Sequence, residues 1–147
     1  MNKILYRDWI FDCDVEGTHR AYERILTGGL EECHCSGCRN FLEQRESVIP
    51  DEVMNLFGQL AINHRRDAEI YYAAPLESGL HLYGGWFHFI GSILKQPNGP
   101  ANVGEHFTID FLPSQDLAAK SFGDQPLVQV EITAEVPWVL ENDKEPD

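Results

Sequence analysis

Three cysteines and a histidine lie within six consecutive residues, as Cys33, His34, Cys35 and Cys38. Thiolates and imidazoles are ligands of Zn²⁺, and ligands one to three residues apart can converge on one ion when a turn folds the backbone around it. A helix expected from Cys38 onward would place that thiol at the positive end of the helix dipole, which favours the thiolate. The spacing therefore predicts a zinc site on these four residues.

The fourth coordination position decides what such a site can do, because three thiolates are one ligand short of a closed tetrahedral site. The candidates are Cys13, His34, His19 and a water molecule. A protein side chain would make zinc a structural link between the first strand and the first helix. A water molecule could instead be activated as a nucleophile. The sequence leaves both roles open.

Thiol redox chemistry is the alternative to metal binding. A pair of cysteines with two residues between them at the start of a helix, as in Cys35 and Cys38, is the arrangement that lowers the pKa of one thiol in disulfide oxidoreductases. The βαβ context of a thioredoxin-like domain is not visible in this chain. A reversible oxidation switch, with Cys33 as the resolving thiol, stays open.

No second constellation of catalytic residues is apparent. His81 and His88 lie in one strand-like run, but their odd separation predicts opposite faces, so a shared metal or acid–base role is disfavoured. The sequence has no nucleophile elbow, glycine-rich phosphate loop or H-E-x-x-H helix. We therefore predict no catalytic residue.

The first half of the chain is expected to hold one strand and two helices. Residues 9–16 alternate between apolar and polar types, which predicts a half-buried strand with Cys13 on its apolar side. Residues 17–32 show no sustained period and are interpreted as a connecting loop. Helices are predicted over 38–47 and from Pro50 onward, where two acids and an apolar stripe follow the proline.

The second half is expected to be β-structure. The run 80–90 is apolar on both faces, as in a central strand, and the pair Gly84 and Gly85 predicts a bulge or bend within it. The predicted fold is α+β, with a mainly antiparallel sheet of about five strands and two helices inserted after the first strand. The strands of this half are predicted over 68–73, 80–95, 106–112 and 127–140.

The length of 147 residues fits a single α+β domain over 1–140 with a flexible acidic tail at 141–147. A chain of this size can bury a core without a metal. Its net charge of −13 disfavours binding to nucleic acid or membranes and leaves a basic protein partner open. Without a signal peptide or a long apolar segment, we expect a cytoplasmic protein with reduced thiols.

One part of the sequence resembles a group of small bacterial cytosolic proteins that have no established activity. The likeness rests on the motif C-x-C-x-x-C-R-N-F, which spans Cys33 to Phe41, and on the run Y-G-G-W-F-H at 83–88. It covers about half of the chain, residues 16–94. The resemblance implies a bacterial cytosolic setting and a single module that contains both the cysteines and the aromatic strand.

The function that these features favour is a non-catalytic, zinc-stapled, soluble protein-binding or regulatory module, for example an immunity factor. An acidic surface would speed its encounter with a basic partner. The alternative is a small metal-dependent or thiol-redox enzyme that uses Cys33, Cys35 and Cys38, with His34 or His19 as a proton carrier.

Overall fold

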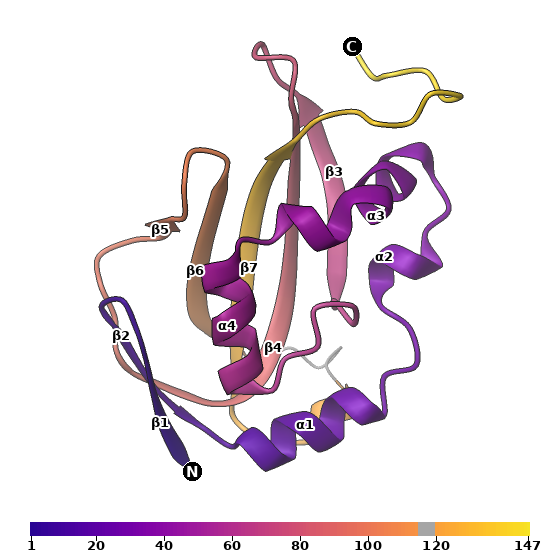
Figure 1. Ribbon diagram of the computed structural model, residues 1–147. Coiled ribbons are helices and arrows are strands. Elements are labelled where there is room, and N and C mark those ends of the chain that lie inside the picture. The colour runs from indigo at the N-terminus through magenta and orange to yellow at the C-terminus, as the bar shows by residue number, and fades with distance from the viewer. Residues whose placement is uncertain (115–119) are drawn as a thin grey trace.

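The computed structural model describes residues 1–114 and 120–147 and confirms an α+β fold with a mainly antiparallel sheet (Figure 1). Seven strands form the sheet in the order β1-β2-β4-β7-β6-β5, and β3 also pairs with β4. The strands are β1 (Asn2–Tyr6), β2 (Trp9–Cys13), β3 (Glu69–Pro75), β4 (His81–Lys95), β5 (Ala101–Asn102), β6 (Phe107–Ser114) and β7 (Leu127–Val136).

The sheet is larger than the five strands predicted, because two short strands were missed. β1 forms a hairpin with β2, in a register that pairs Asn2 with Cys13 and Tyr6 with Trp9. β5 contains two residues and pairs only with β6. β5 is too short to show a pattern, and in β1 the exposed Leu5 lies between the buried Ile4 and Tyr6, so residue type does not alternate with burial.

Four helices lie between β2 and β3, where two helices after the first strand had been predicted. They are α1 (Val15–Glu23), α2 (Gly29–Glu32), α3 (Ser36–Val48) and α4 (Asp51–Leu60), and a 3-10 turn spans Lys120–Phe122. The prediction of a loop over 17–32 is therefore wrong. The buried face of α1 consists of Gly17, Thr18, Ala21 and Tyr22, and its small and polar members hide the helical period.

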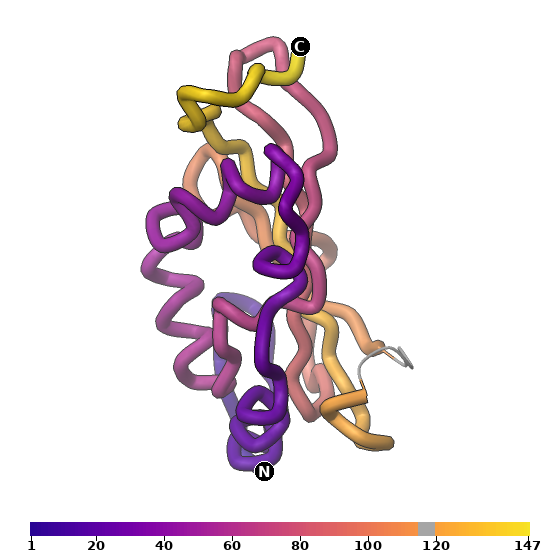
Figure 2. Tube along the Cα trace, turned by 90° about the vertical axis from the view of Figure 1, so that its right-hand side faces the viewer, coloured from indigo at the N-terminus to yellow at the C-terminus, as the bar shows by residue number. Residues whose placement is uncertain are grey.

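The two helices that the sequence did predict, α3 and α4, lie on one side of the sheet (Figure 2). On α4 the apolar stripe is buried as expected, and Phe57 packs edge-on against Phe87 of β4, with 5.0 Å between ring centroids. Phe41 of α3 packs against Tyr83, with 5.2 Å between centroids. The main core therefore fills the space between β4 and these two helices.

β4 is the central strand, as predicted, but it contains no bulge at its glycine pair. Gly84 and Gly85 continue the regular pairing with β7, and the irregularity lies on β3, between Tyr72 and Ala74. The glycines instead permit close packing, since a Cβ atom on Gly85 would lie 2.8 Å from the carbonyl oxygen of Glu69. The strand thus needs glycine at position 85 for space rather than for a bulge.

β7 alternates as the sequence predicts, although it ends at Val136 rather than at residue 140. Its inward residues are Val128, Val130, Ile132, Ala134 and Val136, and all five are buried.

None of the helices in the described ranges is long and apolar enough to cross a membrane.

Candidate metal centre

The sulfur atoms of Cys33, Cys35 and Cys38 lie within 4.8 Å of one another, between the end of α2 and the start of α3. The Sγ atoms of Cys33 and Cys35 are 3.2 Å apart. In a tetrahedral thiolate site with Zn–S bonds of about 2.3 Å, the sulfur atoms lie about 3.8 Å apart. Small side-chain rotations therefore suffice to bring all three onto one ion.

The start of α3 explains why two of the sulfurs meet. Cys35 is the residue that caps the helix, and its Sγ accepts a hydrogen bond from the backbone N–H of Cys38 at 3.4 Å. Cys38 is the third residue of α3, so the first turn of the helix brings its side chain back towards the cap. The predicted placement of Cys38 at the start of a helix is confirmed.

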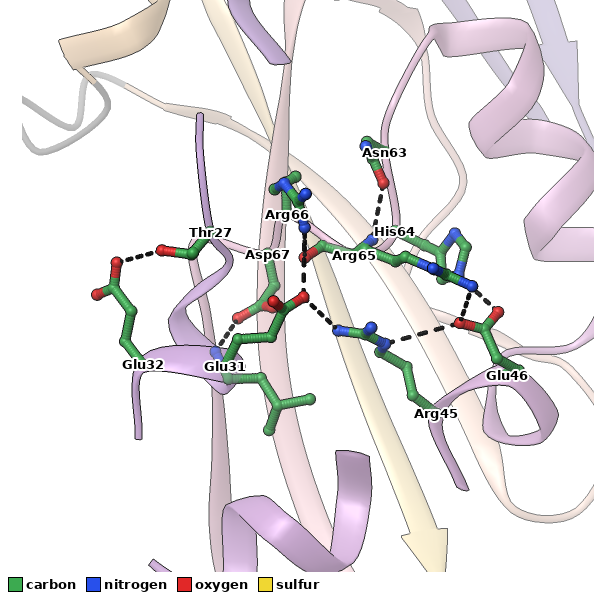
Figure 3. Close-up of polar contacts among 11 residues, drawn as sticks. Thr27, Glu31, Glu32, Arg45, Glu46, Asn63, His64, Arg65, Arg66 and Asp67 are labelled. Atoms are coloured by element: carbon green, nitrogen blue, oxygen red, sulfur yellow. Dashed lines mark hydrogen bonds and ion pairs between the residues drawn. The ribbon is translucent and has the colours of Figure 1, made fainter. Parts of the chain in front are cut away.

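A partly buried ion-pair network holds the segment that leads into Cys33 (Figure 3). Oε1 of Glu31, on α2, accepts hydrogen bonds from Arg45 of α3 at 3.1 Å and from Arg66 at 3.3 Å. The side chain of Arg45 is only 9% exposed, so solvent screens this pair less than it screens a surface pair. Arg45 therefore links α2, which ends just before Cys33, to α3, which begins just after Cys35.

Asp67 holds the start of the same short helix. Its Oδ2 accepts a hydrogen bond from the backbone N–H of Leu30 at 3.0 Å, which satisfies one of the N–H groups at the start of α2. Gly28 leaves room for this carboxylate, because a Cβ atom there would lie 2.5 Å from Oδ1. Burial raises the pKa of Asp67 to about 6, and nearby backbone N–H groups and Arg45 offset only part of that effect.

Tyr83 and Gly37 position the other side of the cluster. The hydroxyl of Tyr83 donates a hydrogen bond to the carbonyl oxygen of Gly37 at 2.7 Å, and burial raises its pKa to about 12, so it stays a neutral donor. A Cβ atom on Gly37 would lie 3.0 Å from Cβ of Tyr72. The glycine between Cys35 and Cys38 therefore lets α3 approach β3, a role that sequence reasoning missed.

The pKa values of the Cys33 and Cys38 thiols are shifted in opposite directions. Burial raises the pKa of Cys38, and hydrogen bonds with Cys33 and Cys35 raise it further. Hydrogen bonds from Cys38 and from Cys35 lower the pKa of the exposed Cys33 thiol. The helix dipole was expected to favour the Cys38 thiolate, whereas burial favours the protonated thiol. A bound metal ion would displace that proton, because coordination requires the thiolate.

Within the described ranges, no fourth ligand atom joins the group of three sulfurs. Cys13 is fully buried on β2, 3.8 Å from the carbonyl oxygen of Leu60, and burial raises its pKa to about 11. Its position in the core confirms the prediction from the apolar side of the first strand. His19 is exposed on α1 and pairs with Glu23 at 2.7 Å. His34 as a metal ligand stays a prediction.

A hollow of about 500 Å³ lies beside the cluster, lined by Cys33, His34, Arg39 and Leu140 among others. Arg39 connects it to the C-terminal segment, since its guanidinium donates to both carboxylate oxygens of Asp143, at 2.8 and 3.0 Å. The C-terminal residues therefore run past the start of α3, as the yellow end of the chain in Figure 1 shows.

The two histidines of β4 lie on opposite faces of the sheet, as their spacing predicts. Nδ1 of His81 is 2.8 Å from the hydroxyl of Tyr72, and Nε2 of His88 is 3.3 Å from Oε1 of Gln129. Both rings are buried. They do not form a joint site, so the cysteine cluster is the stronger candidate for chemistry.

No protein-family model, curated protein or solved structure matches this chain. The resemblance of the C-x-C-x-x-C-R-N-F segment to small bacterial proteins stays a prediction. The chemistry of the site must therefore be inferred from its own residues.

Proposed function

We propose that the chain is a zinc-carrying, protein-binding module that holds one ion on Cys33, Cys35 and Cys38. The observation that supports this proposal is the position of three Sγ atoms within 4.8 Å of one another. Thiolate sulfur favours Zn²⁺ over Mg²⁺ or Ca²⁺, which prefer oxygen ligands. The cluster is also held from both sides by contacts of Glu31 and Tyr83, so little chain entropy is lost when an ion binds.

The environment of the cluster supports a surface site rather than a buried structural one. The domain already has a large apolar core in which the cluster contributes only Cys38. Two of the three thiols, those of Cys33 and Cys35, are exposed. The fourth position of the ion would therefore face solvent or the adjacent hollow, where a donor group from another protein can complete the tetrahedron.

The charge of the chain supports a basic partner for that position. Twenty-four acidic residues stand against eleven Lys and Arg. Such an imbalance attracts a basic surface over several ångströms and speeds the encounter at low ionic strength. Three thiolates around one Zn²⁺ add a further negative charge, which favours the same kind of partner.

The metal content of the purified protein tests this proposal. We expect about one zinc ion per chain when the protein is prepared without a metal-affinity tag and analysed by native mass spectrometry. Cys38→Ser should lose the ion because two thiolates remain. Cys13→Ala is the matched control, since it removes a cysteine that lies in the core. Circular dichroism would verify that both variants fold. Zinc-free wild-type protein under reducing conditions would refute the proposal.

The hollow beside Cys33 and His34 favours a second candidate, a small metal-dependent enzyme with water in the fourth position. X-ray absorption spectroscopy of the zinc-loaded protein tests whether the fourth position is open, as such an enzyme requires. A shell of three sulfurs and one oxygen supports an open site. A shell of three sulfurs and one nitrogen, in which the nitrogen is lost in His34→Ala, supports closure of the site by His34.

A further inference from the structure

The geometry points to Cys33 and Cys35 as a peroxide-sensitive pair: a hydroperoxide oxidises one of these two thiols, and the other then closes a disulfide that leaves Cys38 as the one remaining thiol of the cluster. The disulfide itself requires no metal. The consequence that oxidation releases the zinc ion rests on the function proposed above.

The two sulfurs are already close to bonding distance. Their separation of 3.2 Å exceeds a disulfide bond by about 1 Å. The backbones of Cys33 and Cys35 are both extended, and residues two apart along an extended segment project to the same side. Cys33 follows the last residue of α2 and Cys35 precedes the first residue of α3, so a small shift of either need not unwind a helix.

Cys38 is the less suitable partner. Its side chain is buried, with 5% of the residue exposed, and its backbone belongs to the first turn of α3. Cys33 and Cys35 are both exposed, so a small oxidant in solvent reaches these two thiols first. This assignment keeps Cys33 in the oxidation switch that the sequence left open and names Cys35 as its partner.

The chemistry balances with a hydroperoxide as the only added reactant. The thiolate of one of the pair attacks the peroxide, an S–O bond forms as the O–O bond breaks, and an alcohol or water leaves after taking up a proton. The thiolate of the other cysteine then attacks the sulfur of that sulfenic acid. An S–S bond forms, the S–O bond breaks, and hydroxide leaves as water. Two thiols are oxidised and one peroxide is reduced.

Loss of two of three thiolates would remove most of the ion's ligands. Zinc bound by Cys38 alone would be held no better than by an isolated surface thiol, so the ion should leave. A small dithiol that reduces the bridge should restore binding. The site would then report the presence of peroxide through its metal occupancy.

Peptide mapping tests the disulfide in zinc-free protein. After treatment with hydrogen peroxide and alkylation of free thiols, trypsin releases residues 25–39, a peptide that contains all three cysteines of the cluster. We expect this peptide to have lost two hydrogen atoms, with Cys38 carrying the alkyl group. Cys38→Ser should form the bridge at the wild-type rate, whereas Cys33→Ser and Cys35→Ser should each lack it. Cys13, which is buried, should stay reduced.

Zinc release is measured separately with a chromogenic chelator. Zinc-loaded wild-type protein should release one ion for each bridge formed, and a dithiol should reverse the change. A bridge between Cys35 and Cys38, or stable oxidation of Cys33 without any bridge, would overturn the assignment of the pair. Wild-type protein that forms the predicted bridge but binds no zinc would refute only the proposed function.

Discussion

The buried carboxyl group of Asp67 predicts a pH-dependent stability that Asp67→Asn should remove. The residue is 3% exposed, and burial raises its pKa from an ordinary 3.8 to about 6. Asparagine keeps an oxygen that can accept the hydrogen bond from the Leu30 backbone, but it carries no charge. The variant should therefore retain the start of α2 while it loses the cost of a buried charge.

The sign follows from the raised pKa of the folded state. Between about pH 4 and pH 6 the folded chain binds more protons than the unfolded chain, so stability falls as the pH rises through this window. A pKa difference of about two corresponds to about 3 kcal/mol in total. Between about pH 5 and about pH 7.5, roughly 1.4 kcal/mol of this should be lost.

Urea unfolding, followed by tryptophan fluorescence, measures this effect at the two pH values. The difference in unfolding free energy between Asp67→Asn and wild type should shift by about 1.4 kcal/mol in favour of the variant at the higher pH. Asp143→Asn is the matched control, because Arg39 lowers the pKa of Asp143 and the group stays ionised throughout the window. A difference that does not change with pH, or that shifts the other way, would refute the reasoning.

Two further substitutions test the packing around the site. Gly85→Ala should lower the free energy of unfolding by about 1–3 kcal/mol, because the new methyl group would lie 2.8 Å from the Glu69 carbonyl. Gly58→Ala on α4 is the control, because the new methyl group would have no atom within 4 Å, and it should raise stability by about 1 kcal/mol. Equal effects of the two substitutions on urea unfolding would contradict the close-packing interpretation. Asn40→Asp should cost about 2–4 kcal/mol, since a carboxylate cannot donate to Tyr83 and Pro137 as the buried amide does at 3.2 and 3.0 Å. Carboxypeptidase should then digest the C-terminal segment faster than in wild type, and an unchanged rate would show that Asn40 does not hold it.

The parts of the fold that the sequence predicted are those with a long and regular pattern. The stripe on α4, the alternation of β7 and the apolar faces of β4 each repeat over at least ten residues. α1 was missed because its buried face is small and partly polar. β5 was missed because it has two residues, and β1 because its exposed Leu5 breaks the alternation of apolar and polar types; pairing with β6 and β2 defines them as strands.

The candidate site likewise has features that the sequence predicted and features that it did not. The sequence alone determined which thiols can act together, because Cys33, Cys35 and Cys38 are so close in the chain that one turn unites them. Only the tertiary structure tied α2 to α3, through the ion pair of Arg45 with Glu31. It also decided which thiols solvent reaches, since burial depends on how β3 and β4 pack against the start of α3. Those contacts join residues far apart in the chain, and no local pattern records them.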